Sequence, residues 1–247
     1  MKLPKKVFGI NTEKAYEDYL KRPENENPEL ETVINLSTNT TNPQDYIISR
    51  DNNLYIAKTK ILHNNNWEDT HKLLQQEKGY MLTLPEMYDF ILQLREGIDG
   101  KEVLDGEGNK LPTDEIKAIY DEMLKTGDWR SEWLDARFEK INNKFHINYN
   151  HIIQPNGELQ PQNTEKLEDC IMGDCYVDLI FNSQGLPTKK STNQKYTQGK
   201  NIYYWHPRNN NVALLNAVSV GAVLGCYGDP SSSDVGLGVR KKIFHRK

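Results

Sequence analysis

Cysteines and histidines are the residues of this chain best suited to bind a metal or to attack a substrate. Cys170 and Cys175 lie close together in the segment "EDCIMGDCYVD", and Cys226 follows much later. This spacing differs from the usual C-x2-C zinc half-site, and no second pair exists. The chain has 3 cysteines, and such a small odd number does not suggest a disulfide framework. We therefore expect buried or free thiols.

Neither the histidines nor the known catalytic motifs give a strong signal for a metal site or an active site. His146 and His151 lie near one another, but a histidine pair in a strand-rich stretch is more often structural or exposed than metal-binding. The chain has no G-x-S-x-G elbow, P-loop, G-x-G-x-x-G or H-E-x-x-H motif. We expect no catalytic residue, no metal site and no cofactor.

Composition limits the partners and the location. The 247 residues carry a net charge of −4, which gives no general attraction to nucleic acid or to an anionic membrane. No apolar run approaches the roughly 18–20 residues that span a bilayer, and the N-terminus has no apolar signal-peptide core. We expect no nucleic-acid partner, no membrane insertion, and a location in the cytoplasm or on a virion surface.

Segments with a helical sequence pattern are concentrated before residue 140. The segment that begins at Trp67 and stops at Gly79 has helical spacing, and the T-x-x-E capping box of Thr83 and Glu86 begins a second helix that ends at Gly97. A third helix begins at Thr113. The tryptophans and apolar residues of 128–140, "DWRSEWLDARFEK", predict a fourth short helix.

Segments with a strand-like sequence pattern dominate the later part of the chain. Residues 145–153, 175–181 and 201–207 are rich in β-branched and aromatic residues and are separated by polar loops. Shorter candidates occur earlier, at residues 7–10, 32–36 and 54–62. Helices early and strands late indicate an α+β fold. We expect one domain over residues 1–247, with a possible N-terminal extension over residues 1–60.

The C-terminal segment "NAVSVGAVLGCYGDPSSSDVGLGVR" differs from this polar background. From Val212 to Arg240 the chain contains no Lys, Glu, Gln, Met or Trp. A buried strand followed by a Ser/Gly turn would also lack long polar side chains, so a plain core strand is one explanation.

Two parts of the chain resemble C-type lectin folds of the formylglycine-generating-enzyme subgroup. In "NWEDTHKLLQQEKGYMLTLPEMYDFI", Trp67, Leu84, Pro85 and Glu86 hold places typical of the helix–linker–helix of that subgroup. The text "GLGVRKKI" is similar to the last strand of the fold. The resemblance implies helices in the first half packed on a mainly antiparallel sheet, with a C-terminal strand closing the domain.

The text before "LGVR" resembles the variable region of archaeal diversity-generating retroelement proteins. The residues that match the fixed positions of that region are Ala217, Ser219, Ala222, Leu224, Cys226, Pro230, Ser233 and Leu237 to Arg240. In such families the intervening positions derive from AAY template codons whose adenines are mutated. These codons cannot encode Lys, Glu, Gln, Met or Trp, which fits the composition of residues 212–240.

The resemblance implies a ligand-binding display protein, not an enzyme, with residues 212–240 as its variable region. Its partner would be a macromolecule, a protein or a cell surface, while a reverse transcriptase acts on the gene rather than on the protein. The implied ligand-binding residues are Asn216, Val218, Val220, Gly221, Val223, Gly225, Tyr227, Gly228, Asp229, Asp234 and Val235. The fixed residues Ala217, Ala222, Leu224 and Cys226 are expected to point inward, and the variable residues between positions 218 and 229 outward, as on a strand with one buried face. Pro230 and the serines are expected to hold a turn that carries Asp234 and Val235. Tyr227 is the expected anchor for a ligand.

Three alternatives share the fold. A formylglycine-generating-type oxidase uses two late cysteines to bind copper, but only Cys226 lies in that region. A calcium-dependent lectin uses an E-P-N tripeptide, which "QPN" at residues 154–156 superficially resembles without the W-N-D partner. An invariant protein-interaction domain, with the C-terminal segment as plain core, remains open.

Overall fold

The computed structural model describes residues 6–7, 10–11, 42–51, 53–124, 129–219 and 221–244. The chain divides into two compact units, residues 1–33 and 34–247. In the first unit, β1 (Lys6–Val7) and β2 (Ile10–Asn11) form an antiparallel pair. The strand expected at residues 32–36 lies outside the described residues.

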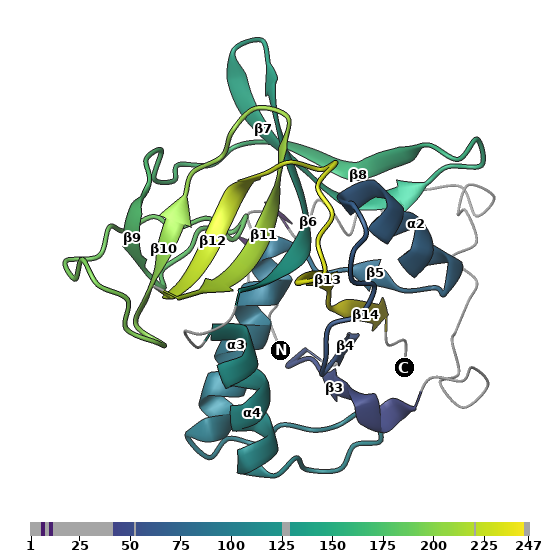
Figure 1. Ribbon diagram of the computed structural model, residues 1–247, viewed down its shortest axis with the longest axis vertical. Coiled ribbons are helices and arrows are strands. Elements are labelled where there is room, and N and C mark those ends of the chain that lie inside the picture. The colour runs from purple at the N-terminus through teal and green to yellow at the C-terminus, as the bar shows by residue number, and fades with distance from the viewer. Residues whose placement is uncertain are drawn as a thin grey trace. The chain divides into compact units, whose positions relative to one another are not determined.

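The second unit contains a large, mainly antiparallel sheet (Figure 1). Its strands are β6 (Arg130–Ile141), β7 (Lys144–Ile153), β8 (Leu159–Lys166), β9 (Cys175–Asp178), β10 (Asn201–Trp205), β11 (Asn211–Val218), β12 (Gly221–Gly228) and β13 (Leu237–Val239). The order across the sheet is β8-β7-β6-β11-β12-β10-β9, and β13 pairs with β6. Only β10–β12 and β13–β6 are parallel among these described strands. The hairpin of β11 and β12 therefore occupies the middle of the sheet.

A smaller antiparallel sheet forms beside the first. It contains β3 (Tyr46–Ile48), β4 (Leu54–Ala57), β14 (Lys241–Phe244) and β5 (Tyr80–Met81), in that order, and a 3-10 turn (Pro43–Asp45) precedes β3. A single residue, Arg240, separates β13 from β14. The C-terminal segment thus passes from the large sheet directly into the small one.

Three helices complete the described part of this unit: α2 (Trp67–Gln76), α3 (Leu84–Ile98) and α4 (Thr113–Leu124). Each begins where the sequence predicts. The side chain of Asn66 accepts a hydrogen bond from the backbone N–H of Asp69, and the backbone N–H of Thr83 donates to Glu86 at 2.7 Å. Such caps satisfy N–H groups that have no partner within the helix.

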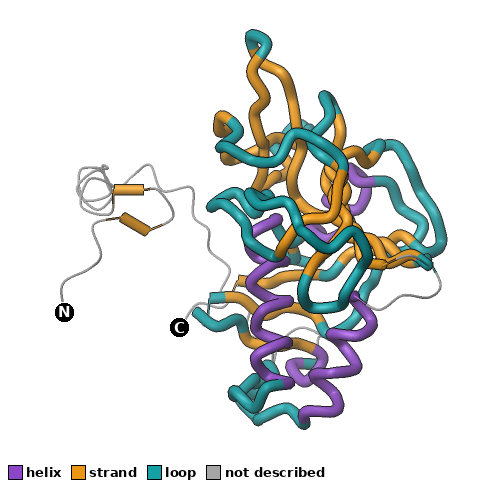
Figure 2. Tube along the Cα trace, turned by 90° about the vertical axis from the view of Figure 1, so that its left-hand side faces the viewer, coloured by secondary structure: helices purple, strands orange, loops and turns teal. Residues whose placement is uncertain are grey.

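Helices α3 and α4 pack against each other and cover one face of the large sheet (Figure 2). Their apolar residues form the main core with Leu134, Leu215 and Leu224 from the sheet. Helix α2 contacts β7 and β5, and its Trp67 joins Trp133 and Val239 in a second core cluster. Apolar packing therefore involves both faces of the central strands.

The fourth helix expected over residues 128–140 is wrong, because this segment forms β6. Trp133 and Leu134 are neighbours in the sequence, yet both are buried, in different core clusters. A strand that is covered on both faces loses the alternation that identifies half-buried strands. Its apolar residues can then match a helical spacing by chance.

The remaining expectations agree with the structure at the level of fold class. Strands form at 144–153, 175–178 and 201–205, and the unit is α+β with a mostly antiparallel sheet. The strand expected at residues 54–62 is β4, which ends at Ala57. None of the helices in the described residues has both the length and the apolar character needed to cross a membrane.

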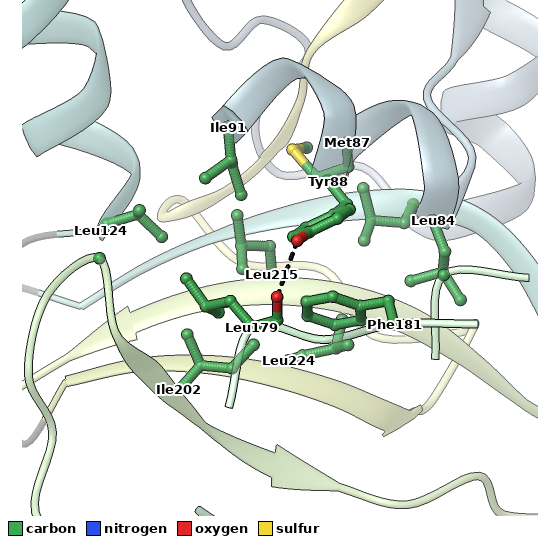
Figure 3. Close-up of a pocket in the computed structure, with 13 residues that line it drawn as sticks. Leu84, Met87, Tyr88, Ile91, Leu124, Leu179, Phe181, Ile202, Leu215 and Leu224 are labelled. Atoms are coloured by element: carbon green, nitrogen blue, oxygen red, sulfur yellow. Dashed lines mark hydrogen bonds between the residues drawn. The ribbon is translucent and has the colours of Figure 1, made fainter. Parts of the chain in front are cut away.

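An apolar crevice of about 30 Å³ lies between α3 and the sheet (Figure 3). Met87 and Ile91 line it from the helix, and Leu215 and Leu224 line it from β11 and β12. The hydroxyl group of Tyr88 donates a hydrogen bond to the carbonyl of Leu179 at 2.7 Å. A space of this size holds about one water molecule. We interpret the crevice as part of the core rather than as a ligand site.

Candidate functional site

The segment singled out by the sequence forms β11, β12, the following loop and β13. Within β12, Ala222, Leu224 and Cys226 belong to the core cluster on the helix side of the sheet. Ala217 is also buried. The inward packing expected for these four positions is confirmed. Val223, Gly225 and Tyr227 alternate with them, so they belong to the opposite face.

The outward exposure expected for many of the variable positions is wrong. Asn216, Gly221, Val223, Gly225 and Gly228 are all buried. The reason is that Leu214, Trp133, Tyr227 and Tyr196 cover the glycines. A Cβ atom at Gly228 would lie 2.8 Å from Leu214 and 3.1 Å from Trp133, one at Gly225 would lie 2.8 Å from Tyr227, and one at Gly221 would lie 2.4 Å from Tyr196. Val220 lies outside the described residues.

Asn216 has a partner of its own inside the sheet. It lies opposite Ser131 in the register of β11 and β6, and the Ser131 hydroxyl donates a hydrogen bond to the Asn216 side-chain oxygen. Both side chains are buried. Buried polar groups of this kind are normally satisfied within the protein, and this bond gives a partner to the Ser131 hydroxyl and to the Asn216 side-chain oxygen.

Five of the expected residues do reach the surface. Val218 and Tyr227 are partly exposed, Asp229 and Asp234 are exposed, and Val235 has 77% of its surface exposed. The last three lie on the loop between β12 and β13.

This loop, residues 229–236, is held at both ends. The backbone N–H of Trp67 donates to the carbonyl of Pro230 at 3.0 Å, and the backbone N–H of Asn64 donates to the carbonyl of Asp234 at 3.1 Å. The Asp229 and Asp234 side chains each accept a hydrogen bond from a backbone N–H two residues later. The loop therefore combines exposed side chains with a tethered backbone.

A row of aromatic side chains continues from Tyr227 across the neighbouring strands. Ring centroids are separated by 5.1 Å between Tyr227 and Trp205, 5.8 Å between Trp205 and Tyr203, and 5.0 Å between Tyr203 and Tyr176. Strand register places Trp205 beside Gly225 and Tyr203 beside Val223. All four rings are partly exposed. We call Tyr176, Tyr203, Trp205 and Tyr227 the aromatic row.

Charged groups flank one end of the aromatic row. The Arg208 guanidinium lies 5.6 Å from the ring centroid of Trp205 and 5.8 Å from that of Tyr227. Asp174 lies 3.5 Å from Arg208 and 2.6 Å from the Nδ1 atom of His206. Partial burial raises the pKa of Asp174, but hydrogen bonds from His206 and the nearby positive charges outweigh it and leave the pKa lowered. The carboxylate therefore stays ionised at neutral pH and orients the Arg208 guanidinium and the His206 ring.

The sequence did not identify Tyr176, Tyr203, Trp205 or Arg208 as site residues. The alternation in "NIYYWHP" placed aromatic residues on both faces of one strand. It did not reveal that Tyr204 points into the core while its neighbours join the row. Only the pairing of β9, β10 and β12 brings the four rings together.

The three cysteines of the chain are free thiols in the structure. Two of them, Cys170 and Cys226, both interact with Tyr204. Burial raises the pKa of Cys170 to about 11 and raises that of Cys226 well above its ordinary value. Both are therefore protonated at neutral pH, whereas a thiol acts as nucleophile or metal ligand in the thiolate form.

Comparison of the chain with protein-family models, with curated protein sequences and with solved structures finds no match. The function must therefore be argued from the site itself.

Proposed function

We propose that this chain is a ligand-binding display protein of C-type lectin fold, whose exposed C-terminal residues are diversified through mutagenesis of adenines in its gene. The observation that supports this best is the aromatic row, which ends at Tyr227, directly before the exposed loop 229–236. The row and the loop together form the proposed binding face.

The chemistry of this face suits a macromolecular partner such as a protein or a cell surface. Tyrosine and tryptophan provide large contact areas at low entropic cost, and arginine is also enriched at the energetic centres of interfaces. Arg208 lies against two rings of the row, and Asp174 fixes its position. The strands supply a rigid base, and the loop supplies most of the side chains that can change.

The packing narrows the set of residues that can vary. At Val218, Tyr227, Asp229, Asp234 and Val235 the side chain reaches solvent, so substitution there alters the surface without disturbing the core. At Gly221, Gly225 and Gly228 any side chain meets a neighbour at close range. We therefore propose that diversification is tolerated mainly at the first five positions.

Sequencing the 3′ end of this gene from many clones of the source population tests the proposal. We expect substitutions to concentrate at the five exposed positions, while Ala217, Cys226 and Pro230 stay fixed. The codons of residues 144–166, from the same clones, measure ordinary drift as an internal control.

An evenly conserved 3′ end would overturn diversification and leave an invariant interaction domain of the same fold. Substitutions concentrated at the buried glycines would contradict the proposal that variation is confined mainly to the five exposed positions. They would not contradict diversification itself. The two outcomes are distinguishable in one data set.

A further inference from the structure

A second group of polar side chains is buried between α2 and the large sheet, in elements other than β9, β10 and β12. It consists of His71 on α2, Asp135 on β6 and His151 on β7, with 1%, 2% and 3% of their surfaces exposed. One potential ligand atom from each residue lies within 4.8 Å of the other two. Three separate elements thus converge their metal-binding side chains on one point.

Asp135 is the centre of the group. Its Oδ1 atom lies 2.5 Å from Nδ1 of His151 and 3.7 Å from Nε2 of His71. Its Oδ2 atom accepts a hydrogen bond from the backbone N–H of His151 at 3.1 Å. The backbone of β7 therefore holds the carboxylate, while its other oxygen faces both imidazole rings.

His71 has no hydrogen-bond partner at either ring nitrogen, although both atoms are buried. A buried polar atom without a partner costs roughly 1–3 kcal/mol, so such atoms are rare unless something else satisfies them. The ring is held in place by Trp67, whose centroid lies 4.4 Å away in an edge-to-face arrangement. The position of His71 is thus fixed, but its nitrogen atoms lack a protein partner.

We propose that His71, Asp135 and His151 bind a divalent first-row transition metal of the Zn²⁺ type. Two imidazoles and a carboxylate are ligands that Zn²⁺ accepts at about 2.0–2.2 Å. Tetrahedral coordination at that length separates ligand atoms by roughly 3.3 Å. The distance of 3.7 Å between His71 and Asp135 is already close to this value, whereas His151 must move away from Asp135 by on the order of 1 Å.

The surroundings are compatible with a cation. Lys242, whose charge acts on this group, is ion-paired with Glu86 at 2.6 Å, which limits its repulsion of a metal ion. Asp135 supplies the negative charge.

A cavity of about 240 Å³ adjoins the proposed site and is lined by Trp67 and His151, with polar residues that include Glu68 and Asn148. It gives a metal ion and water a route to the ligands. Three protein ligands leave one tetrahedral position for a water molecule. The bound metal would also connect α2 to β6 and β7.

Titration of the full chain with Zn²⁺ by calorimetry, and with Co²⁺ by visible absorption, tests the proposal. We expect one metal per chain and a Co²⁺ spectrum typical of four-coordinate sites. We also expect Zn²⁺ to raise the melting temperature and a chelator to reverse this, because a ligand that binds only the folded state stabilises it.

His71→Leu is the informative variant, because it removes a side chain that makes no hydrogen bond and should still fold. It should weaken metal binding by about 100-fold or more and abolish the shift in melting temperature. His146→Gln is the matched control, since His146 lies on the same strand as His151 but outside the group. The control should bind metal as the unaltered chain does.

Absence of stoichiometric binding by the unaltered chain would overturn the proposal. Equal binding by His71→Leu would do so too, since the metal would then lie elsewhere. In either case the group would be a purely structural contact between α2 and the sheet.

Discussion

The guanidinium of Arg240 lies 2.8 Å from the carboxylate of Glu132, and both side chains are fully buried. Arg240 also donates hydrogen bonds to the backbone carbonyls of Ala57 and Lys58. Glu132 belongs to the large sheet, Ala57 belongs to the small sheet, and Arg240 is the residue between β13 and β14. The side chain of Arg240, the last residue of the "LGVR" segment, therefore joins the two sheets.

Arg240→Met should lower the free energy of unfolding by about 3–5 kcal/mol, because it leaves a buried carboxylate short of a partner. Arg208→Met is the matched control: Arg208 is exposed, and its ion pair with Asp174 should be worth only about 0–1 kcal/mol. Urea unfolding followed by circular dichroism measures both. Similar losses in the two variants would show that the link between the sheets contributes little.

Glu132 also makes stability depend on acid pH. Burial raises its pKa, but the charges of Arg240 and Arg130 outweigh burial and hold the pKa below the ordinary value of 4.5. A carboxyl group with a lowered pKa in the folded state stabilises the protein above its unfolded pKa. That contribution is lost as the pH falls through the folded pKa.

We therefore expect the free energy of unfolding to fall as the pH drops below about 4.5, and to fall less steeply in Glu132→Gln. The measurement is a set of urea unfolding curves from about pH 7 to about pH 3. If the free energy of unfolding falls equally steeply in the two proteins, Glu132 does not contribute to the loss of stability at acid pH.

The sequence predicts the three described helices because their ends are encoded locally. The Thr83–Glu86 capping box is readable from four adjacent residues, and the structure contains the corresponding hydrogen bond. Strand β6 was not predictable in this way. Leu134 of β6 packs in the main core with residues of α3, and Trp133 packs in a second cluster with Trp67 of α2. Both faces of the strand are thus covered by elements that lie far away in the sequence, which local periodicity cannot show.

The candidate face shows the same limit. Alternation within β12 correctly placed Leu224 and Cys226 in the core. Exposure of the opposite face depends on what covers it, and Leu214 and Trp133 cover Gly228 from other strands. Tyr227 belongs to an aromatic row whose other members come from β9 and β10, so no local pattern could define the site.

Asn216 should behave as a structural residue rather than as a ligand contact. Asn216→Ala leaves the buried hydroxyl of Ser131 without its partner, so we expect a loss of about 1–3 kcal/mol in the free energy of unfolding. Adding Ser131→Ala should recover part of this loss, because no unpaired group then remains. Additive losses in the double variant, measured by denaturant unfolding, would show that the two side chains do not depend on each other.

The narrowed set of variable positions predicts a contrast in tolerance. Val235→Asn places a polar side chain where 77% of the valine surface is already exposed, and it should change the free energy of unfolding by less than about 0.5 kcal/mol. Gly228→Asn places a side chain against Leu214 and Trp133, and should cost about 1–3 kcal/mol through overpacking.

The same new residue is used at both positions, so the comparison isolates the site from the chemistry of the substitution. Thermal and denaturant unfolding of the two variants supply the values. A Gly228→Asn protein as stable as Val235→Asn would show that Leu214 and Trp133 can move aside. The buried positions would then be able to vary, and the proposed binding face would extend over more of β12.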